Sequence, residues 1–328
     1  MKPVETLERC GKTAASASTA RFKFIFTMEF KDMGTKVGVI GTGNIGFGMC
    51  CNLLEAGFEL VVYDVRSEPL SALDSRGATI VSSPADVGRA CRLVFSVVFD
   101  HPQNLAVLQG PDGLLEKMAP GGCIFMCSTI SPAHARELAG LAAAYNIQLL
   151  DCPVSGGQQG ATHGALTLMI GGDRHCVDEH HTALEAISAN IYYLGDVGAG
   201  AAAKIVNNLL VAVHNLAAAE SLMLAAKSGI DLKQMYDIVG NSAGQSWMFD
   251  NRAMRMIERD FTPRGALKIL LKDMDIALEA AQSYNLVLPL SAITREMFQA
   301  GVNQGLGDED DSASVKVLEQ MTNFSLSD

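Results

Sequence analysis

The sequence has few aromatic and few charged residues, and it lacks the marks of several protein classes. Of its 328 residues, 6% are aromatic, 19% are charged, and only one is a tryptophan. The formal net charge is −11, which argues against a surface that binds nucleic acid or anionic membranes. There is no uninterrupted apolar run of about 18 residues, so we expect no membrane-spanning helix.

The eight cysteines include no C-x-x-C pair, and no histidine follows Cys123 or Cys127 at ligand spacing. We therefore expect no metal site. Most of the cysteines lie in apolar, strand-like runs, namely Cys91, Cys123, Cys127 and Cys152. This pattern is typical of reduced core residues, and it favours a cytoplasmic location.

Residues 1–33 differ from the rest of the chain. Six basic and four acidic residues give them a net charge of +2, which leaves −13 for the remainder. The A-A-S-A-S-T-A-R segment resembles an organelle transit peptide, but Glu5 and Glu8 are unusual in one. We favour a disordered extension or a start codon placed too early, with Met28 or Met33 as the true start; organelle targeting stays open.

A glycine-rich turn between two short apolar strands is the most informative motif. Gly41, Gly43 and Gly46 follow the first strand at G-x-G-x-x-G spacing around Asn44 and Ile45, and the second strand ends at Asp64. In such a turn the first glycine allows a tight bend, the second admits a pyrophosphate, and the third lets helix and strand pack closely. A carboxylate at the end of the second strand accepts ribose hydroxyls. The motif predicts a bound dinucleotide.

Strand-like and helix-like segments alternate from Val37 to about Leu194. We expect strands at 37–40, 60–63, 93–98, 123–126, 148–151, 166–171 and 191–194, with helices such as 133–144 and 177–187 between them. This alternation indicates an α/β fold with a Rossmann-type, parallel, doubly wound sheet. We place the dinucleotide-binding domain at residues 34–196.

The remaining part, residues 197–328, has helical periodicity. An alanine-rich stretch at 201–228 predicts a long helix into a second domain, and further helices are expected at 232–239, 247–258, 266–284 and 290–304. We expect an all-helical domain for substrate binding and oligomerisation. The acidic run 308–311 is interpreted as a solvated turn and helix start rather than a metal site.

Four separated motifs identify a resemblance that covers residues 35–318. They are the glycine turn, D-C-P-V-S-G-G-Q-Q-G-A at 151–161, G-A-G-A-A-A-K-I-V-N-N at 198–208 and K-D-M at 272–274. In this order the chain resembles the β-hydroxyacid dehydrogenases, which include 3-hydroxyisobutyrate dehydrogenase and tartronate semialdehyde reductase. The resemblance implies a small hydroxyacid substrate and a nicotinamide cofactor.

The resemblance places the family's catalytic lysine at Lys204. It is the only charged residue between Asp196 and Glu220, and burial among apolar residues lowers the pKa of a lysine toward the working pH of a general base. Asn208 lies four residues on, so both side chains share a helical face. The alternatives are a lysine that extends its amine to solvent and an asparagine that caps a neighbouring backbone.

Two loops are expected to bind the substrate. Ser155, Gly156 and Gly157 follow a predicted strand, and consecutive glycines expose N–H groups that can cradle a carboxylate; in the family this loop binds the acid group. Ser128 and Thr129 follow another strand, at the edge of the sheet where ligands bind. A plain glycine-rich turn is the alternative for the first loop.

Further cofactor contacts are implied by the resemblance. Val98 and Phe99 end a strand where the family has Leu-Pro, Thr129 touches the cofactor as well as the substrate, and Lys272 reaches over the nicotinamide. Asp64 repels a 2′-phosphate and favours NAD over NADP, although Arg66 could accommodate that phosphate. Lys268 stands where relatives carry aspartate, either on the surface or near a more anionic ligand.

The stretch N-S-A-G-Q-S-W-M-F-D-N at 241–251, with F-T-P-R at 261–264 and E-D-D-S-A at 309–313, resembles the L-threonate dehydrogenase branch. In that interpretation Gln245 and Ser246 hydrogen-bond the extra hydroxyls of the substrate, and Trp247 is a core or interdomain anchor or a substrate contact. The alternatives are oxidation of 3-hydroxyisobutyrate, an NAD(P)H-dependent reductase of a tartronate- or succinate-type semialdehyde, and a non-catalytic NAD-binding protein. We expect a homodimer or homotetramer.

Overall fold

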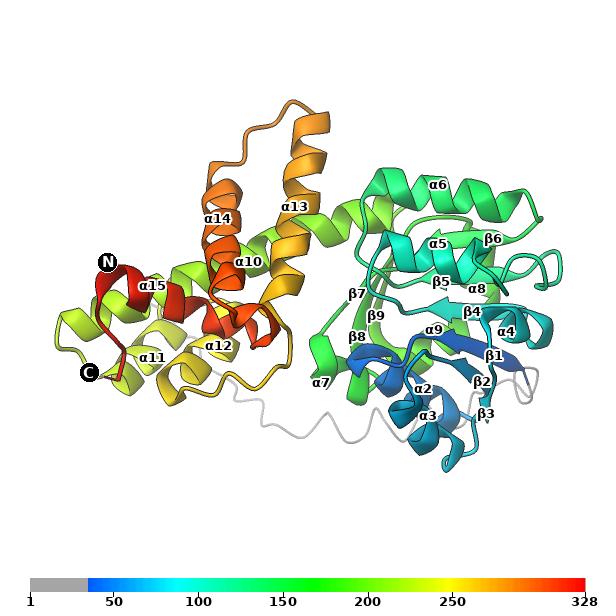
Figure 1. Cartoon of the computed structure of the whole chain (residues 1–328), viewed down its shortest axis with the longest axis horizontal. Coiled ribbons are helices and arrows are strands. Elements are labelled where there is room, and N and C mark those ends of the chain that lie inside the picture. Colours follow the sequence, from blue (N-terminus) through cyan, green and yellow to red (C-terminus); the bar gives the residue numbers. More distant parts are fainter. Residues whose placement is uncertain (1–34, 328) are drawn as a thin grey trace, which may run out of the picture.

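The computed structural model of the chain describes residues 35–327 and shows two domains, one built on a parallel sheet and one made of helices (Figure 1). The expectations for residues 1–33, which concern disorder, targeting and the true start, lie outside the described residues. The cytoplasmic location stays a prediction.

A six-stranded parallel sheet forms the centre of the first domain. Its strands are β1 (Lys36–Ile40), β2 (Glu59–Tyr63), β3 (Thr79–Ile80), β4 (Leu93–Ser96), β5 (Cys123–Met126) and β6 (Gln148–Asp151). Their spatial order is β3-β2-β1-β4-β5-β6, so the direction of winding changes between β1 and β4. Dinucleotides bind at that point in sheets of this kind, and this confirms the predicted Rossmann-type fold.

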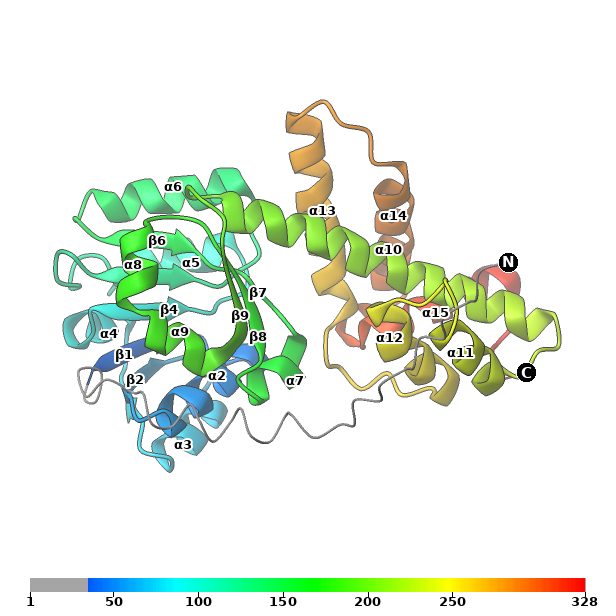
Figure 2. The same cartoon turned by 180° about the vertical axis from the view of Figure 1, so that it is seen from behind.

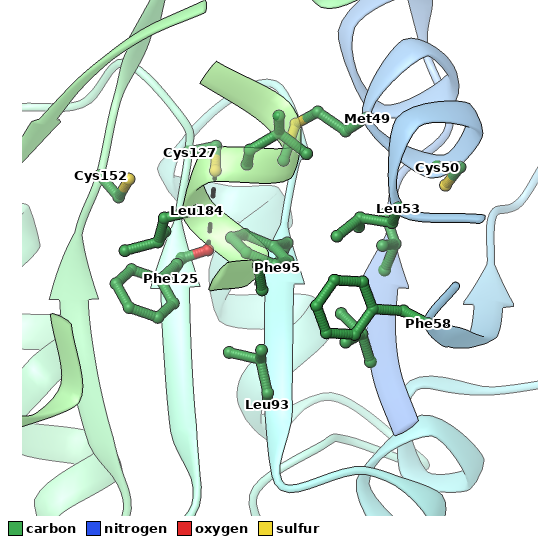
Figure 3. Packing of buried hydrophobic residues seen from close by; sticks show 14 of the residues in the cluster. Met49, Cys50, Leu53, Phe58, Leu93, Phe95, Phe125, Cys127, Cys152 and Leu184 are labelled. Carbon is green, nitrogen blue, oxygen red and sulfur yellow. Dashed lines mark hydrogen bonds between the residues drawn. The ribbon is translucent and has the colours of Figure 1, made fainter. Parts of the chain in front are cut away.

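Helices cover both faces of the sheet. They are α2 (Asn44–Glu55), α3 (Ser67–Asp74), α4 (Pro84–Ala90), α5 (His101–Gln109), α6 (Pro132–Ala143), α8 (Arg174–Glu179) and α9 (His181–Ile187). One apolar core lies under α2 and α9, and another lies under α4, α5 and α6. Figure 3 shows the first, in which Cys127 and Cys152 pack beside Phe95 and Phe125. All seven cysteines in the described residues are free, as predicted.

The last strands of this domain do not join the parallel sheet. The expectation that the strands at 166–171 and 191–194 belong to that sheet was therefore wrong. β7 (Val154–Ser155), β8 (Leu166–Ile170) and β9 (Ser188–Tyr193) form a separate sheet in which β7 and β8 are antiparallel. Gly156 and Gly157 have φ values of +125° and +61° and reverse the chain around α7 (Gly157–Thr162). The helix expected at 177–187 is divided at His180 into α8 and α9.

The second domain consists of helices around one long helix, α10 (Ala199–Lys227), which runs from the sheet domain along the whole helical domain (Figures 1 and 2). The others are α11 (Leu232–Gly240), α12 (Trp247–Glu258), α13 (Leu267–Ser283), α14 (Pro289–Asn303) and α15 (Ser314–Thr322), with the short helices η1 (Leu306–Asp308) and η2 (Asp311–Ala313).

Within residues 35–327, α10 is the one helix whose length and composition would allow it to cross a membrane. It contacts α12, α13 and α15 along its length, and its buried residues include Ala212, Leu216 and Leu222. The helix therefore forms the central packing element of the helical domain. Its apolar character is interrupted by polar residues, among them Lys204, Asn208, His214 and Glu220, which is why no uninterrupted run is visible in the sequence.

The acidic run 308–311 differs from the expectation in its second half. Asp308 is exposed, but Asp310 and Asp311 are 0% and 3% exposed and pair with arginines of α12. The second half of the turn is thus buried, because the arginines replace the water that the carboxylates of Asp310 and Asp311 would otherwise need.

Candidate active site

The glycine turn has the shape that a diphosphate requires. Gly41 has a φ of +94°, and a Cβ there would lie 2.5 Å from the carbonyl oxygen of Val97. A Cβ on Gly46 would lie 2.0 Å from the carbonyl oxygen of Gly41, whereas one on Gly43 would meet nothing closer than 3.8 Å. The outer glycines therefore close the turn, and the space beside Gly43 stays open for a ligand. Asn44 and Ile45 begin α2, where free N–H groups attract phosphates.

Asp64 follows β2 at the same edge of the sheet. Its Oδ2 accepts hydrogen bonds from the N–H and the hydroxyl of Thr42 at 2.5 and 2.9 Å, and its Oδ1 accepts one from the Arg66 N–H at 2.8 Å. Burial raises the pKa of Asp64, but the hydrogen bonds from Arg66 and Thr42 outweigh it and lower the pKa to about 2. The carboxylate is ionised at neutral pH, and the ribose contact that the sequence predicts for it stays a prediction.

Ser128 joins the loops that follow β4 and β5. Its hydroxyl donates to the Val98 carbonyl at 2.6 Å and accepts from the Asn104 amide at 2.8 Å. Ser128 is buried, so its side chain holds the two loops in register. The ligand contact predicted for it stays a prediction.

Lys272, in α13, connects the helical domain to these loops. Its Nζ donates to the Thr129 carbonyl at 2.9 Å and lies 4.9 Å from the centre of the Phe99 ring. Phe99, which stands where the family has proline, thus contributes an aromatic face to a cation–π contact. Lys268, one helical turn earlier, forms an exposed ion pair with Asp308 and lies on the surface.

Lys204, Asn208 and Asp273 form a buried polar cluster between α10 and α13. Lys204 is 9% exposed, and the Asn208 amide donates to Asp273 Oδ2 at 2.5 Å. Asp273 Oδ1 also pairs with Lys272 Nζ at 3.1 Å. The cluster thus links the two lysines that the motifs single out. Asn207 donates to Asn208 at 3.0 Å and orients its amide.

The pKa of Lys204 is lowered from 10.5 to about 8. Burial is the main cause, and Lys272 adds to it, while the charge of Asp273 acts in the opposite direction. An amine with a pKa of about 8 can both take and release a proton near neutral pH, which is what an acid–base catalyst requires. The alternative of an amine extended to solvent does not describe a side chain with this exposure.

Asp151 was not singled out from the sequence, yet it holds the start of the helix that carries Lys204. It is fully buried at the end of β6, and its two carboxylate oxygens accept from the N–H groups of Gly198 and Ala201 at 2.7 and 2.6 Å. A Cβ on Gly200 would lie 2.2 Å from the Met169 carbonyl oxygen, so only glycine permits this close docking. In the sequence, this role could have been inferred from the position of Asp151 at the end of a predicted strand.

Ser155, Gly156 and Gly157 lie at the start of α7, on the side of the sheet domain that faces the helical domain (Figure 1). Both glycines have positive φ values and are exposed, while Ser155 is half-buried. No contact joins this loop directly to Lys204 in the described residues, so its role in holding a carboxylate stays a prediction.

The residues that suggested the L-threonate branch are used mainly in building the fold. The Ser246 hydroxyl caps α12 by accepting from the Phe249 N–H at 3.0 Å, and the Gln245 amide donates to Asp250 at 2.5 Å. Trp247 is 58% exposed beside Arg252, so it is not a core anchor. The substrate contacts expected of this stretch stay a prediction.

Comparisons with known proteins cover both domains. Residues 36–195 match the family described as the NAD binding domain of 6-phosphogluconate dehydrogenase, and residues 198–318 match the one described as NAD-binding of NADP-dependent 3-hydroxyisobutyrate dehydrogenase. An L-threonate dehydrogenase of Cupriavidus necator is 38% identical over 87% of this chain and 97% of its own. A 2-(hydroxymethyl)glutarate dehydrogenase of Eubacterium barkeri is 36% identical over 89% of this chain and 97% of its own.

A solved structure is similar over most of the described part. The crystal structure of a 3-hydroxyisobutyrate dehydrogenase from Salmonella typhimurium aligns with a TM-score of 0.82 at 36% identity, over 86% of this chain and 99% of that one. Both domains are therefore shared, and with them the long helix between them.

Proposed function

The chain belongs to the 3-hydroxyisobutyrate dehydrogenase-related family of β-hydroxyacid dehydrogenases and is an NAD(P)-dependent oxidoreductase, and we propose that Lys204 is its general base. The observation that carries this role is a single buried lysine whose pKa is lowered to about 8. A non-catalytic binding protein would have no reason to keep an amine at this cost in solvation.

The proposed reaction divides the work between cofactor and protein. The nicotinamide, when bound, accepts a hydride from the carbinol carbon. The free amine of Lys204 takes the proton of the hydroxyl group as the bond between the carbinol carbon and its hydrogen breaks. The Asn208 amide, with one N–H committed to Asp273, has its second N–H for the substrate oxygen. Lys272 adds positive charge beside this cluster and raises the proportion of free amine at Lys204.

The carboxylate of the substrate is proposed to lie against Ser155, Gly156, Gly157 and Thr129. Two consecutive glycines with positive φ leave their N–H groups without side chains in front of them, which supports binding of an anion. Thr129 follows β5 of the parallel sheet, and its carbonyl accepts a hydrogen bond from Lys272. A protein of net charge −11 needs such a local site to bind an acid.

L-Threonate is the proposed substrate. The support is the similarity to a relative named L-threonate dehydrogenase, together with the stretches at 241–251 and 309–313. These stretches mostly cap helices and form buried ion pairs. They therefore support the L-threonate branch as features of the fold and not as substrate contacts. The similar relative named 2-(hydroxymethyl)glutarate dehydrogenase and the similar structure of a 3-hydroxyisobutyrate dehydrogenase make these two acids the second candidates.

The test is NADH formation by the purified full chain with L-threonate, 2-(hydroxymethyl)glutarate, 3-hydroxyisobutyrate, glycerate and serine. We expect the highest kcat/KM with L-threonate and its loss in Lys204→Met. Turnover of another acid that also disappears in Lys204→Met would keep the base and refute the substrate. Unchanged turnover in Lys204→Met would refute the base.

NAD is expected to be preferred over NADP. The Asp64 carboxylate is ionised and would face a 2′-phosphate, and Arg66 is already bound to that carboxylate through its N–H and side chain. Rates with the two cofactors, measured for the natural chain and for Asp64→Asn, test this. A natural preference for NADP, or an unchanged ratio in the variant, would contradict it.

The helical domain is proposed to form the contact between copies of the chain. The connection between α13 and α14, together with the start of α14, exposes large apolar side chains, namely Tyr284, Leu286, Val287, Leu290 and Ile293, each at least 59% exposed. Such a patch is unusual on a monomer. Light scattering should show a dimer or tetramer that Val287→Asp weakens; a monomeric natural chain would refute the proposal.

A further inference from the structure

Two histidines and a glutamate from neighbouring helices meet on the surface of the sheet domain. His101 is the first residue of α5, and His134 and Glu137 lie near the start of α6. One ligand atom of each lies within 4.8 Å of the other two. The His101 Nε2 is 3.2 Å from Glu137 Oε2, and the two imidazole rings stack with their centres 3.9 Å apart.

We propose that His101, His134 and Glu137 bind one divalent transition-metal ion of the zinc type. Neutral imidazoles and a carboxylate are the nitrogen and oxygen ligands that zinc prefers after thiolates, at distances of about 2.0–2.2 Å. Two atoms 3.2 Å apart are spaced as two ligands of one such ion are. Within residues 35–327 this is the one group of three such side chains close enough to share an ion.

The charge balance of the cluster also suits a cation. The N-termini of α5 and α6 carry partial positive charge that would repel a cation. The negative charge of the Glu137 carboxylate offsets this partial charge. The Glu137 side chain is 49% exposed and that of His101 is 17% exposed, while the His101 Nε2 is buried without a hydrogen-bond partner and is thus free to ligate an ion. Three protein ligands leave a further position for water.

One side-chain movement is required. The rings are nearly parallel, 10° apart, so their lone pairs do not point at the same place. Rotation of the His134 ring about χ2 brings its nitrogen toward the other two ligands, and this torsion is broad in proteins. The backbone positions, which set the distances between α5 and α6, do not have to change.

The ion would join the beginnings of two helices whose preceding loops carry proposed ligand contacts. The loop before α5 contains Val98 and Phe99, and the loop before α6 contains Ser128 and Thr129. Because it binds only the folded arrangement, the ion should raise the melting temperature of the protein. None of the three ligands belongs to the proposed base or to the carboxylate site.

The experiment is a titration of the tag-free, chelator-treated full chain with Co²⁺, followed by displacement with Zn²⁺. We expect visible absorption bands of cobalt that saturate at one ion per chain, without the near-ultraviolet band of thiolate ligation, and a higher melting temperature with Zn²⁺. His101→Ala and His134→Ala should each weaken binding on the order of tenfold or more.

His181→Ala is the matched control, because His181 faces Glu185 at 3.3 Å as a two-residue pair on α9. It should leave cobalt binding unchanged. Circular dichroism and metal-free dehydrogenase activity report whether each variant folds, and Glu137→Gln tests the third ligand without removing a ring. Absence of cobalt bands, a thiolate band, or equal affinity in His101→Ala and the natural chain would overturn the proposal.

Discussion

The helical domain contains two buried clusters of charged side chains, and they differ in how their charges are balanced. Near the sheet domain, Lys204 and Lys272 share the single carboxylate of Asp273. Farther along α10, two arginines face two carboxylates: Arg252 forms a bidentate pair with Asp311 at 2.5 and 3.0 Å, and Arg255 binds Asp310.

The difference separates a functional cluster from a structural one. In the second cluster each buried charge has a partner, and Asn215 of α10 adds a hydrogen bond to the Asp311 carbonyl at 2.8 Å, so it can hold α10, α12 and η2 together. In the first, Lys204 has no carboxylate of its own and its charged form is disfavoured. A buried cation that lacks a full partner is costly to the fold and useful as a base.

Lys204→Met should give the largest effect and would sharpen this contrast. We expect kcat to fall by about 10²–10⁴-fold, the usual contribution of a general base. The folded pKa of about 8 lies below the ordinary value of 10.5, so the unfolded chain binds the proton more tightly and the natural lysine destabilises the fold below pH 8. The variant should therefore be more stable at neutral pH, on the order of 2–3 kcal/mol.

Both effects are measured on one preparation, by steady-state kinetics and by urea unfolding at several pH values. The stability gain should shrink as the pH rises from about 8 toward 10.5. Lys233→Met, at an exposed lysine of α11, is the control and should change neither quantity. A loss of stability in Lys204→Met would contradict the proposed difference between the two clusters.

Arg252→Ala should show the opposite behaviour. It leaves Asp311 buried without its partner, and we expect a loss of about 3–5 kcal/mol in the free energy of unfolding. The kcat of the folded fraction should stay near the natural value. Lys268→Ala, which removes an exposed ion pair with Asp308, is expected to cost only about 0–1 kcal/mol; equal losses in the two variants would show that burial does not matter here.

Asp151→Asn tests whether the start of α10 positions the base. An amide can accept from only one of the two N–H groups that the carboxylate binds, so we expect a stability cost of about 1–3 kcal/mol and a smaller kcat. KM for NAD should change little. Asp173→Asn, which alters the cap of α8, is the matched control; a kcat unchanged in Asp151→Asn would assign that residue to stability alone.

The smallest expected effect is on pH dependence. The rate of hydroxyacid oxidation should rise with pH as Lys204 loses its proton and level off above about pH 8. Asp273 raises the pKa of Lys204, so Asp273→Asn should move the midpoint lower, by roughly one pH unit. A midpoint that stays in place, or moves higher, would mean that another group controls the profile.

The local patterns predicted most elements closely. The strands at 123–126 and 148–151 and the helix at 247–258 agree with β5, β6 and α12, because each is a run of consistent period bounded by turn residues. The second sheet was missed, since its pairing depends on the reversal at Gly156 and Gly157 and on the bridge between Asp151 and Gly171. Local pattern does not carry the partner of a strand.

The same limit applied to the polar residues. The acidic run 308–311 looked solvated because its partners, Arg252 and Arg255, are more than 50 residues away in the sequence. The role of Asp151 in holding the first turn of α10 was hidden for the same reason. In each case the environment of the charge depends on residues that packing brings near.

The sequence alone determined the motifs: the glycine turn with Asp64, the alternation that builds the sheet, and a lone lysine in an apolar helix. These are local, because chain geometry and hydrophobic periodicity act over a few residues. Only the tertiary structure decided which charges are paired. In the folded chain Asp310 and Asp311 pair with arginines, whereas Lys204 shares the carboxylate of Asp273 with Lys272. The cost of a buried charge depends on its neighbours in space, and folding alone assembles them.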